Sequence, residues 1–187
     1  MRSKVLIFFV AVATLAFVSL GGCLEDDDGG LLDMGGSGVL DVRFGFDSFL
    51  VTYTCDGENL SPPVEIDRID GSVESMAMIL EDPDAPRGTF VHWLIWNLEP
   101  SATVAGGIPP EGEVSDPAKA VQGTNGFGLI GYYGPCPPSG QAHRYVLKVY
   151  GLDSDLGLAP GSDRSDLEAA MEGHLLQSGE AVATYGR

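Results

Sequence analysis

Two aspartates, two histidines and a tyrosine occupy positions from which they could together bind a small anion. Asp82 and Asp84 lie in the sequence Asp-Pro-Asp-Ala-Pro, where two prolines restrict a turn that carries both carboxylates. His92 opens the apolar segment that follows, and His143 and Tyr145 lie together in a later one. An imidazole can share a proton with a phosphate or carboxylate while a neighbouring aspartate fixes its tautomer. If the strands that carry these residues are neighbours, we expect a small polar pocket for an anion.

Two further features border this set of residues. The sequence Gly-Pro-Cys-Pro-Pro around Pro135 is a second rigid segment, which we expect to wall the pocket. Arg144 lies on the opposite face of its strand from His143, so it is better suited to an ion pair with an acidic loop than to the ligand. Asp84 could likewise have a structural role and accept hydrogen bonds within its own turn.

The same side chains would also suit an enzyme. Asp82, Asp84, His92 and His143 could hold a divalent cation for metal-assisted hydrolysis, and this is the alternative to a binding protein. The sequence lacks Gly-x-Ser-x-Gly, His-Glu-x-x-His and Cys-x-x-Cys, and its Gly-x-Gly-x-x-Gly match at 126–131 is followed by prolines rather than a helix. Since the sequence contains no recognisable activated nucleophile, we favour a binding protein without a cofactor.

The apolar residues recur mostly with the period of β-strands. Strands are expected at the segments 39–44, 75–80, 91–98, 142–152 and 181–185. In the fourth of these segments the side chains alternate, and His143 and Tyr145 share one face with apolar residues. These two polar-tipped rings should therefore open the core face of their strand toward solvent.

One helix is expected, at 166–177. Ser165 and Glu168 have the spacing of a capping box, and Gly179 would end the helix. His174 falls on its apolar stripe, where we expect a structural role. With 26 glycines and 12 prolines in 187 residues, long helices are not expected. Many short strands and one late helix predict a mostly β domain of the sandwich type.

The charge of the chain excludes one class of partner. Ten lysines and arginines oppose 27 aspartates and glutamates, which gives a formal net charge of −17 at pH 7. A surface this negative repels phosphate backbones, so nucleic acid is not an expected partner. Hydrophobic residues make up 44% of the chain, which is enough for one packed domain.

The first 38 residues have the composition of a signal and a tether. Residues 1–22 have the order of a signal peptide, with a basic start, an uncharged apolar run and a small-residue exit. The sequence Leu-Gly-Gly-Cys that ends at Cys23 resembles the lipobox of prokaryotic lipoproteins, in which the cysteine carries the lipid after cleavage. Residues 23–38 then form an acidic, glycine-rich tether, and 39–187 form the folded domain.

We therefore expect an extracytoplasmic domain that is anchored to the cell membrane through a lipid on Cys23. Several acyl methylenes at ~0.8 kcal/mol each can hold a soluble domain on a bilayer. Removal of 1–22 leaves 8 basic against 27 acidic residues, or a net charge of −19. The alternatives are an ordinary secretory signal with an incidental Cys23 or an uncleaved anchor helix, and either would also export the domain.

The remaining cysteines, Cys55 and Cys136, form an even pair in an oxidising compartment. They could be bridged, or they could be two buried thiols that act as small apolar side chains. A bridge would close a loop of about 80 residues and stabilise the fold by roughly 4 kcal/mol at most. The sequence does not fix the distance between them, so both interpretations stay open.

These residues and their order resemble the phosphatidylethanolamine-binding protein family, in the prokaryotic branch called Raf kinase inhibitor-like. The similar segments are YTCDGENLSPP at 53–63, EDPDAPRGTFVHWLIWNL at 81–98, GTNGFGLIGYYGPCPPSGQAHRYVLKVYGLD at 123–153 and LEAAMEGHLLQSGEAVATYGR at 167–187. The combination of Asp-Pro-Asp-Ala-Pro with a later Gly-Pro-x-Pro-Pro and His-Arg-Tyr is the specific part of this resemblance. It implies two antiparallel sheets in a Greek-key sandwich with short helices.

The resemblance also implies a pocket for phosphate-like anions. By the family's motifs, the pocket falls on Asp82, His92, Pro135, His143 and Tyr145, with Asp84 in support. The implied ligand is a phospholipid head group or another small anion, and some relatives inhibit a protein partner such as a protease.

The lipobox and the tether are departures from cytosolic relatives. Regulation of a cytoplasmic kinase is therefore not expected, because an exported domain does not meet one.

Overall fold

The computed structural model describes residues 38–187. The predicted signal peptide, Cys23 and the predicted tether up to residue 37 lie outside the described residues and stay predictions. None of the helices in the described part of the chain combines the length and the apolar character that a membrane crossing requires.

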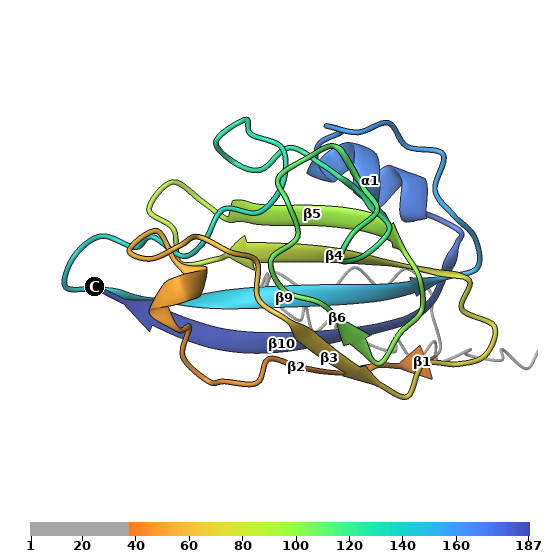
Figure 1. Cartoon of the computed structure of the whole chain (residues 1–187), viewed down its shortest axis with the longest axis horizontal. Coiled ribbons are helices and arrows are strands. Elements are labelled where there is room, and N and C mark those ends of the chain that lie inside the picture. Colours follow the sequence, from red (N-terminus) through yellow and green to blue (C-terminus); the bar gives the residue numbers. More distant parts are fainter. Residues whose placement is uncertain (1–37) are drawn as a thin grey trace, which may run out of the picture. The chain divides into compact units, whose positions relative to one another are not determined.

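Short and long strands dominate the described domain. In chain order its elements are β1 (Gly38–Val39), β2 (Asp41–Arg43), the 3-10 helix η1 (Val51–Tyr53), β3 (Val64–Asp67), β4 (Ser75–Asp82), β5 (Phe90–Leu98), β6 (Thr103–Val104), β7 (Glu113–Val114), β8 (Ala120–Gln122), β9 (Ala142–Leu152), α1 (Arg164–Met171) and β10 (Leu175–Gly186). The four longest strands, β4, β5, β9 and β10, lie side by side (Figure 1). They form the frame on which the loops of the candidate site are held.

The strands form two sheets. The larger has seven strands in the order β1-β10-β9-β4-β5-β8-β7, and the smaller has three in the order β2-β3-β6. The strand pairs are antiparallel except that of β1 with β10. The predicted strand at 39–44 is divided at Leu40, because β1 joins the larger sheet and β2 the smaller. The prediction of a mostly β, two-sheet sandwich with a C-terminal helix is confirmed.

The centre of the larger sheet is buried on both faces because a different layer covers each. Every residue of β4 is buried. Met76, Met78 and Leu80 belong to the main core, which the smaller sheet also lines. Ala77 and Ile79 point the other way, into a second core that α1 covers (Figure 1). This double burial explains why a central strand of this sheet has so few polar residues.

The predicted start of the helix is wrong. The N-cap of α1 is Asp163, whose side chain accepts the backbone N–H of Asp166, and the two residues form a capping box. The predicted pair was Ser165 and Glu168, which has the same three-residue spacing. Because both pairs satisfy the pattern, the sequence alone could not choose between the two starting points.

The predicted end of the helix is also wrong, because the last residues of 166–177 belong to a strand. β10 begins at Leu175 and pairs with β9 as far as Gly186. Gly179 lies inside this strand, where an added side chain would collide with the backbone of Leu40. His174 lies in the turn before β10, with Nδ1 2.7 Å from Oδ1 of Asp153. Pairing along a whole strand outweighs helical spacing over a few residues.

Candidate functional site

The ends of three adjacent strands bring the predicted histidines and Asp82 together. β4 lies between β5 and β9 and is antiparallel to both, so its C-terminal end lies beside their N-terminal ends (Figure 1). Asp82 is the last residue of β4, while His92 and His143 lie near the starts of β5 and β9. Asp82 and His143, which are 61 positions apart in the sequence, therefore meet at one edge of the sheet.

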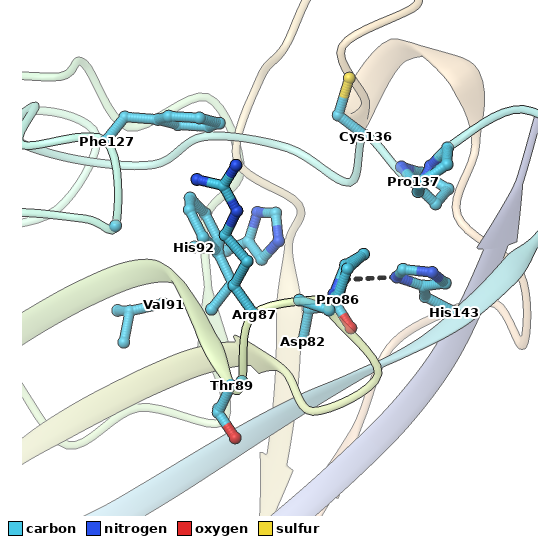
Figure 2. Close-up of a pocket in the computed structure, with 15 residues that line it drawn as sticks. Asp82, Pro86, Arg87, Thr89, Val91, His92, Phe127, Cys136, Pro137 and His143 are labelled. Atoms are coloured by element: carbon cyan, nitrogen blue, oxygen red, sulfur yellow. Dashed lines mark hydrogen bonds and ion pairs between the residues drawn. The ribbon is translucent and has the colours of Figure 1, made fainter.

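A cavity of about 670 Å³ opens at this edge of the sheet. Its lining comes from the turn after β4, the start of β5, two loops and the start of β9. The lining residues are Asp82, Ala85, Pro86, Arg87, Gly88, Thr89, Phe90, Val91, His92, Gly126, Phe127, Cys136, Pro137, Pro138 and His143. Figure 2 shows both imidazoles on the lining, with Asp82 beside His143. The volume is in the range of sites for small organic molecules.

His143 is held in one orientation by Asp82. Its Nδ1 lies 2.7 Å from Oδ2 of Asp82, and both side chains are almost fully buried. The other carboxylate oxygen, Oδ1, accepts the backbone N–H of Asp84 at 2.9 Å. Nδ1 of His143 therefore carries a proton, whereas Nε2 has only a long contact of 3.5 Å with Gln141. Asp82 thus orients the ring, and Nε2 is the atom that His143 offers to a ligand.

His92 is held in a similar way by a backbone carbonyl group. Its Nδ1 donates to the carbonyl oxygen of Tyr133 at 2.6 Å, and its Nε2 makes no hydrogen bond within residues 38–187. Burial lowers the pKa of His92 below its ordinary value, so the ring is neutral at neutral pH. A neutral Nε2 can accept a hydrogen bond from a protonated ligand oxygen, and a protonated Nε2 can donate one to an anion.

Two predicted site residues lie behind the cavity instead of on its lining. Pro135 is buried, and its carbonyl oxygen accepts the backbone N–H of Cys55 at 3.1 Å. Tyr145 is fully buried, with its ring centroid 5.2 Å from that of His92. Its hydroxyl group has no hydrogen-bond partner among the described residues, and burial raises its pKa. Tyr145 supports the imidazole from behind.

Asp84, the remaining predicted residue, is also absent from the lining and is paired with Arg144. The carboxylate of Asp84 accepts hydrogen bonds from the backbone N–H, Nε and Nη2 of Arg144, at 2.9, 3.0 and 2.7 Å. These hydrogen bonds lower the pKa of Asp84 to about 2. The pair ties the turn after β4 to β9, and this turn carries Arg87 to the cavity.

The lining includes residues that we did not predict. Arg87 is exposed, and no ion pair among the described residues involves it. Phe90 and Phe127 form an aromatic wall, with ring centroids 4.7 Å apart. Arg87 could have been noticed, because it directly follows Asp-Pro-Asp-Ala-Pro in a chain with only ten basic residues. Phe127 gave no such signal, since it lies in a glycine-rich segment without periodicity.

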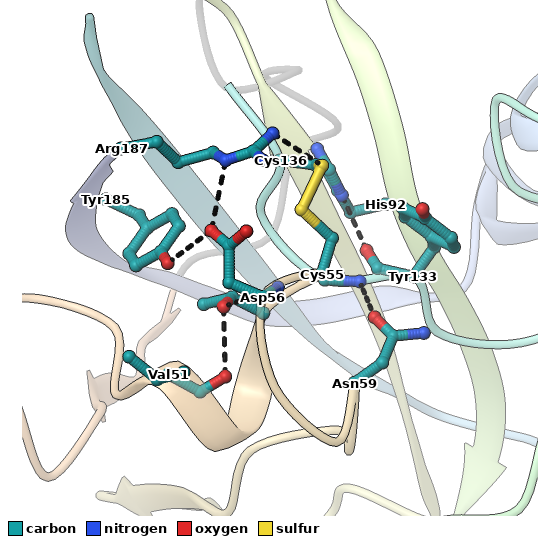
Figure 3. Close-up of a disulfide and its surroundings, with 11 residues drawn as sticks. Val51, Cys55, Asp56, Asn59, His92, Tyr133, Cys136, Tyr185 and Arg187 are labelled. Atoms are coloured by element: carbon teal, nitrogen blue, oxygen red, sulfur yellow. Dashed lines mark hydrogen bonds and ion pairs between the residues drawn. A yellow bond between two sulfur atoms is a disulfide. The ribbon is translucent and has the colours of Figure 1, made fainter. Parts of the chain in front are cut away.

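A disulfide joins Cys55 to Cys136 and supports one wall of the cavity (Figure 3). The two sulfur atoms are 2.04 Å apart, and Cys136 lies on the lining next to Pro137. Asn59 reinforces this connection, because its Oδ1 accepts the backbone N–H of Gly134 at 2.7 Å. The wall around Pro137 is therefore attached to a segment that lies about 80 residues earlier in the chain.

The fold and the site together define a two-sheet β-sandwich with a cavity at the ends of its central strands. The chain belongs to the phosphatidylethanolamine-binding protein family, whose model matches residues 44–186. It is 48% identical over 181 residues to the UPF0098 protein of Pyrococcus abyssi, a match that covers 94% of this chain and 97% of that one. The UPF0098 protein of Pyrococcus horikoshii is 45% identical, over 95% of this chain and 88% of its own.

Solved structures have the same fold. A phosphatidylethanolamine-binding protein homologue from Chlamydia trachomatis is 32% identical, with a TM-score of 0.71 over 81% of this chain and 99% of that one. YbcL of Escherichia coli, described as a member of the mammalian family, has a TM-score of 0.70 over 79% of this chain and 98% of its own. At 24% identity, the likeness to YbcL concerns the fold alone.

Proposed function

We propose that this protein binds a small anionic ligand, such as a phosphate head group, in the cavity at the ends of β4, β5 and β9. The observation that carries the proposal is that two imidazoles line one cavity and that each has its Nδ1 engaged by a protein acceptor. Both Nε2 atoms are thereby left for a ligand. Two fixed donor or acceptor atoms on one cavity suit an oxyanion, whose several oxygens can be hydrogen-bonded at the same time.

Arg87 supplies the charge that the imidazoles alone do not guarantee. The carboxylate of Asp82 is next to His143, and a neutral His92 adds no charge, so the interior of the cavity is not strongly positive. Arg87 is on the lining without an ion-pair partner among residues 38–187, and a guanidinium group matches two oxygens of a phosphate. In a chain with a net charge of −17, this local cation is what favours an anion at the cavity.

Metal-assisted hydrolysis is not the function that we propose. Among the described residues, no three His, Cys, Asp or Glu side chains are grouped as metal ligands would be. The carboxylate of Asp82 is hydrogen-bonded to His143, and the carboxylate of Asp84 is hydrogen-bonded to Arg144. Both carboxylates are therefore already occupied by partners within the protein. Inhibition of a protein partner such as a protease is favoured by no observation on the described residues.

Titration calorimetry with inorganic phosphate at pH 7 tests the proposed function. We expect Arg87→Gln and His143→Ala each to weaken binding by about 10-fold or more, because each removes a hydrogen bond to a charged ligand. The control Arg43→Gln removes the same charge from β2, where Arg43 pairs with Asp67, and should leave the affinity unchanged. Wild-type protein that does not bind phosphate, or variants that bind it as tightly, would contradict the proposal.

We also propose that a lipid on Cys23 holds the domain outside the cytoplasm. The support is the apolar run before Leu-Gly-Gly-Cys, together with a disulfide, which persists in oxidising compartments. Mass spectrometry of the membrane fraction should find a chain that begins at an acylated Cys23, and Cys23→Ser should move the protein out of that fraction. A chain that retains Met1, or that has an unmodified Cys23, would rule out this anchor.

A further inference from the structure

The cavity has room for more than an oxyanion, and its charged groups occupy only part of it. A volume of about 670 Å³ is typical of sites that bury an organic molecule rather than an isolated ion. Arg87, His92 and His143 are its cationic and imidazole groups, whereas the largest of the other lining side chains are the apolar Phe90 and Phe127. A ligand that fills this cavity therefore needs an apolar part as well as an anion.

A continuous aromatic surface leads from the mouth of the cavity to one imidazole. Phe127 is 58% exposed, and its ring centroid lies 4.7 Å from that of Phe90. Phe90 in turn lies 4.8 Å from His92, with the two rings edge to face. On its other side, Phe127 is 4.7 Å from Tyr133. Figure 2 shows the Phe127 ring across the cavity from His143, with His92 between them. An apolar group attached to an anion at His92 would meet these rings.

Phe127 is exposed although its loop is well ordered by hydrogen bonds. Oδ1 of the buried Asn125 accepts the backbone N–H groups of Phe127 and Leu129, at 3.0 and 3.3 Å. Nδ2 of Asn125 donates to the carbonyl oxygen of Gly131 at 3.0 Å. Gly128 provides the positive φ of +76° that the turn requires. An exposed aromatic residue whose backbone is held in place at a cavity is already positioned for contact with a ligand.

We infer that the ligand is a phosphate-class anion that carries a flat apolar substituent, an aryl phosphate ester in its simplest form. This inference rests on the proposed function, since it places the anion at Arg87 and the two imidazoles. The flat substituent then lies against Phe127 and Phe90, as aromatic rings pack edge to face or offset on one another. The exposed face of Phe127 becomes covered only when the ligand is bound.

Calorimetry with phenyl phosphate and inorganic phosphate under identical conditions tests this inference. We expect wild-type protein to bind phenyl phosphate about 10-fold more tightly than inorganic phosphate, which is the scale of one aromatic contact with its buried area. Phe127→Ala should lose this difference and keep its affinity for inorganic phosphate. Leu129→Ala is the matched control, because Leu129 is an exposed apolar residue of the same loop that does not line the cavity, and it should keep the difference.

The outcomes separate this inference from the proposed function. Equal affinities for the two ligands, or a difference that survives Phe127→Ala, would overturn the inference and leave anion binding intact. Hexyl phosphate that binds as tightly as phenyl phosphate would overturn the requirement for a flat substituent. If neither phosphate compound binds the wild-type protein, the proposed function fails, and the inference fails with it.

Discussion

Removal of the disulfide by the double substitution Cys55→Ser, Cys136→Ser is expected to lower the free energy of unfolding by about 4 kcal/mol. The two cysteines are 81 positions apart, so the bridge closes a long loop in the unfolded chain and restricts its conformations. The bridged segments keep other contacts when the bridge is absent, because Asn59 still binds Gly134 and Tyr132 still donates to the carbonyl oxygen of Tyr53. The folded state should therefore survive, and the loss should come from the unfolded chain.

Denaturant unfolding, with and without a reductant, measures this effect. Reduction of the wild-type protein should lower its stability to that of the double variant, whereas the double variant should not respond to the reductant. Phosphate affinity should change by less than about threefold, because Arg87 and the two imidazoles are attached to other elements. A reduced wild-type protein as stable as the oxidised one would contradict the long-loop argument. A large loss of affinity would instead show that the disulfide shapes the cavity.

Features with a local cause could be predicted from the sequence. Alternation over 142–152 predicts that His143 and Tyr145 share the core face of β9, and both are buried there in the structure. The expectation that both rings open this face toward solvent is wrong for Tyr145, because its ring and its hydroxyl group are fully buried. The same alternation puts Arg144 on the other face, where it meets an acidic turn, as expected. A strand needs only its own period of two to assign these faces, so no knowledge of its neighbours was required.

Features that depend on the order of strands could not be predicted in this way. Asp82 and His143 meet because β9 pairs with β4 and not with β8, the strand before it in the sequence. No local sequence pattern specifies that order of strands, and only the resemblance to a family suggested that Asp82 and His143 lie in one pocket. Likewise, the role of Arg87 and Phe127 depends on a cavity between separate loops. The wrong prediction of the start of the helix has a third cause, because two pairs of residues with capping-box spacing lie within a few residues of each other.

A buried ion cluster holds α1 against the larger sheet, directly beside the strand end that carries Asp82. Glu81 points to the opposite face of β4 from Asp82 and is 5% exposed. Its Oε1 lies 2.7 Å from Nζ of Lys148 on β9, and its Oε2 lies 2.7 Å from Nη1 of Arg164 on α1. Arg164 also binds Glu168 at 2.7 Å. One carboxylate therefore neutralises a buried ammonium group and links three elements.

Glu81→Leu is expected to lower the free energy of unfolding by about 3–5 kcal/mol, because it leaves Lys148 buried without a partner. The double variant Glu81→Leu, Lys148→Met should recover most of this loss, since two apolar side chains then replace the ion pair and Arg164 keeps Glu168. Glu180→Leu is the matched control, because Glu180 lies opposite Lys148 in β10 but is exposed, and its effect should stay within about 0.5 kcal/mol. Chemical denaturation of the four proteins provides the comparison. A double variant no more stable than Glu81→Leu would mean that the cost lies in packing and not in the uncompensated charge.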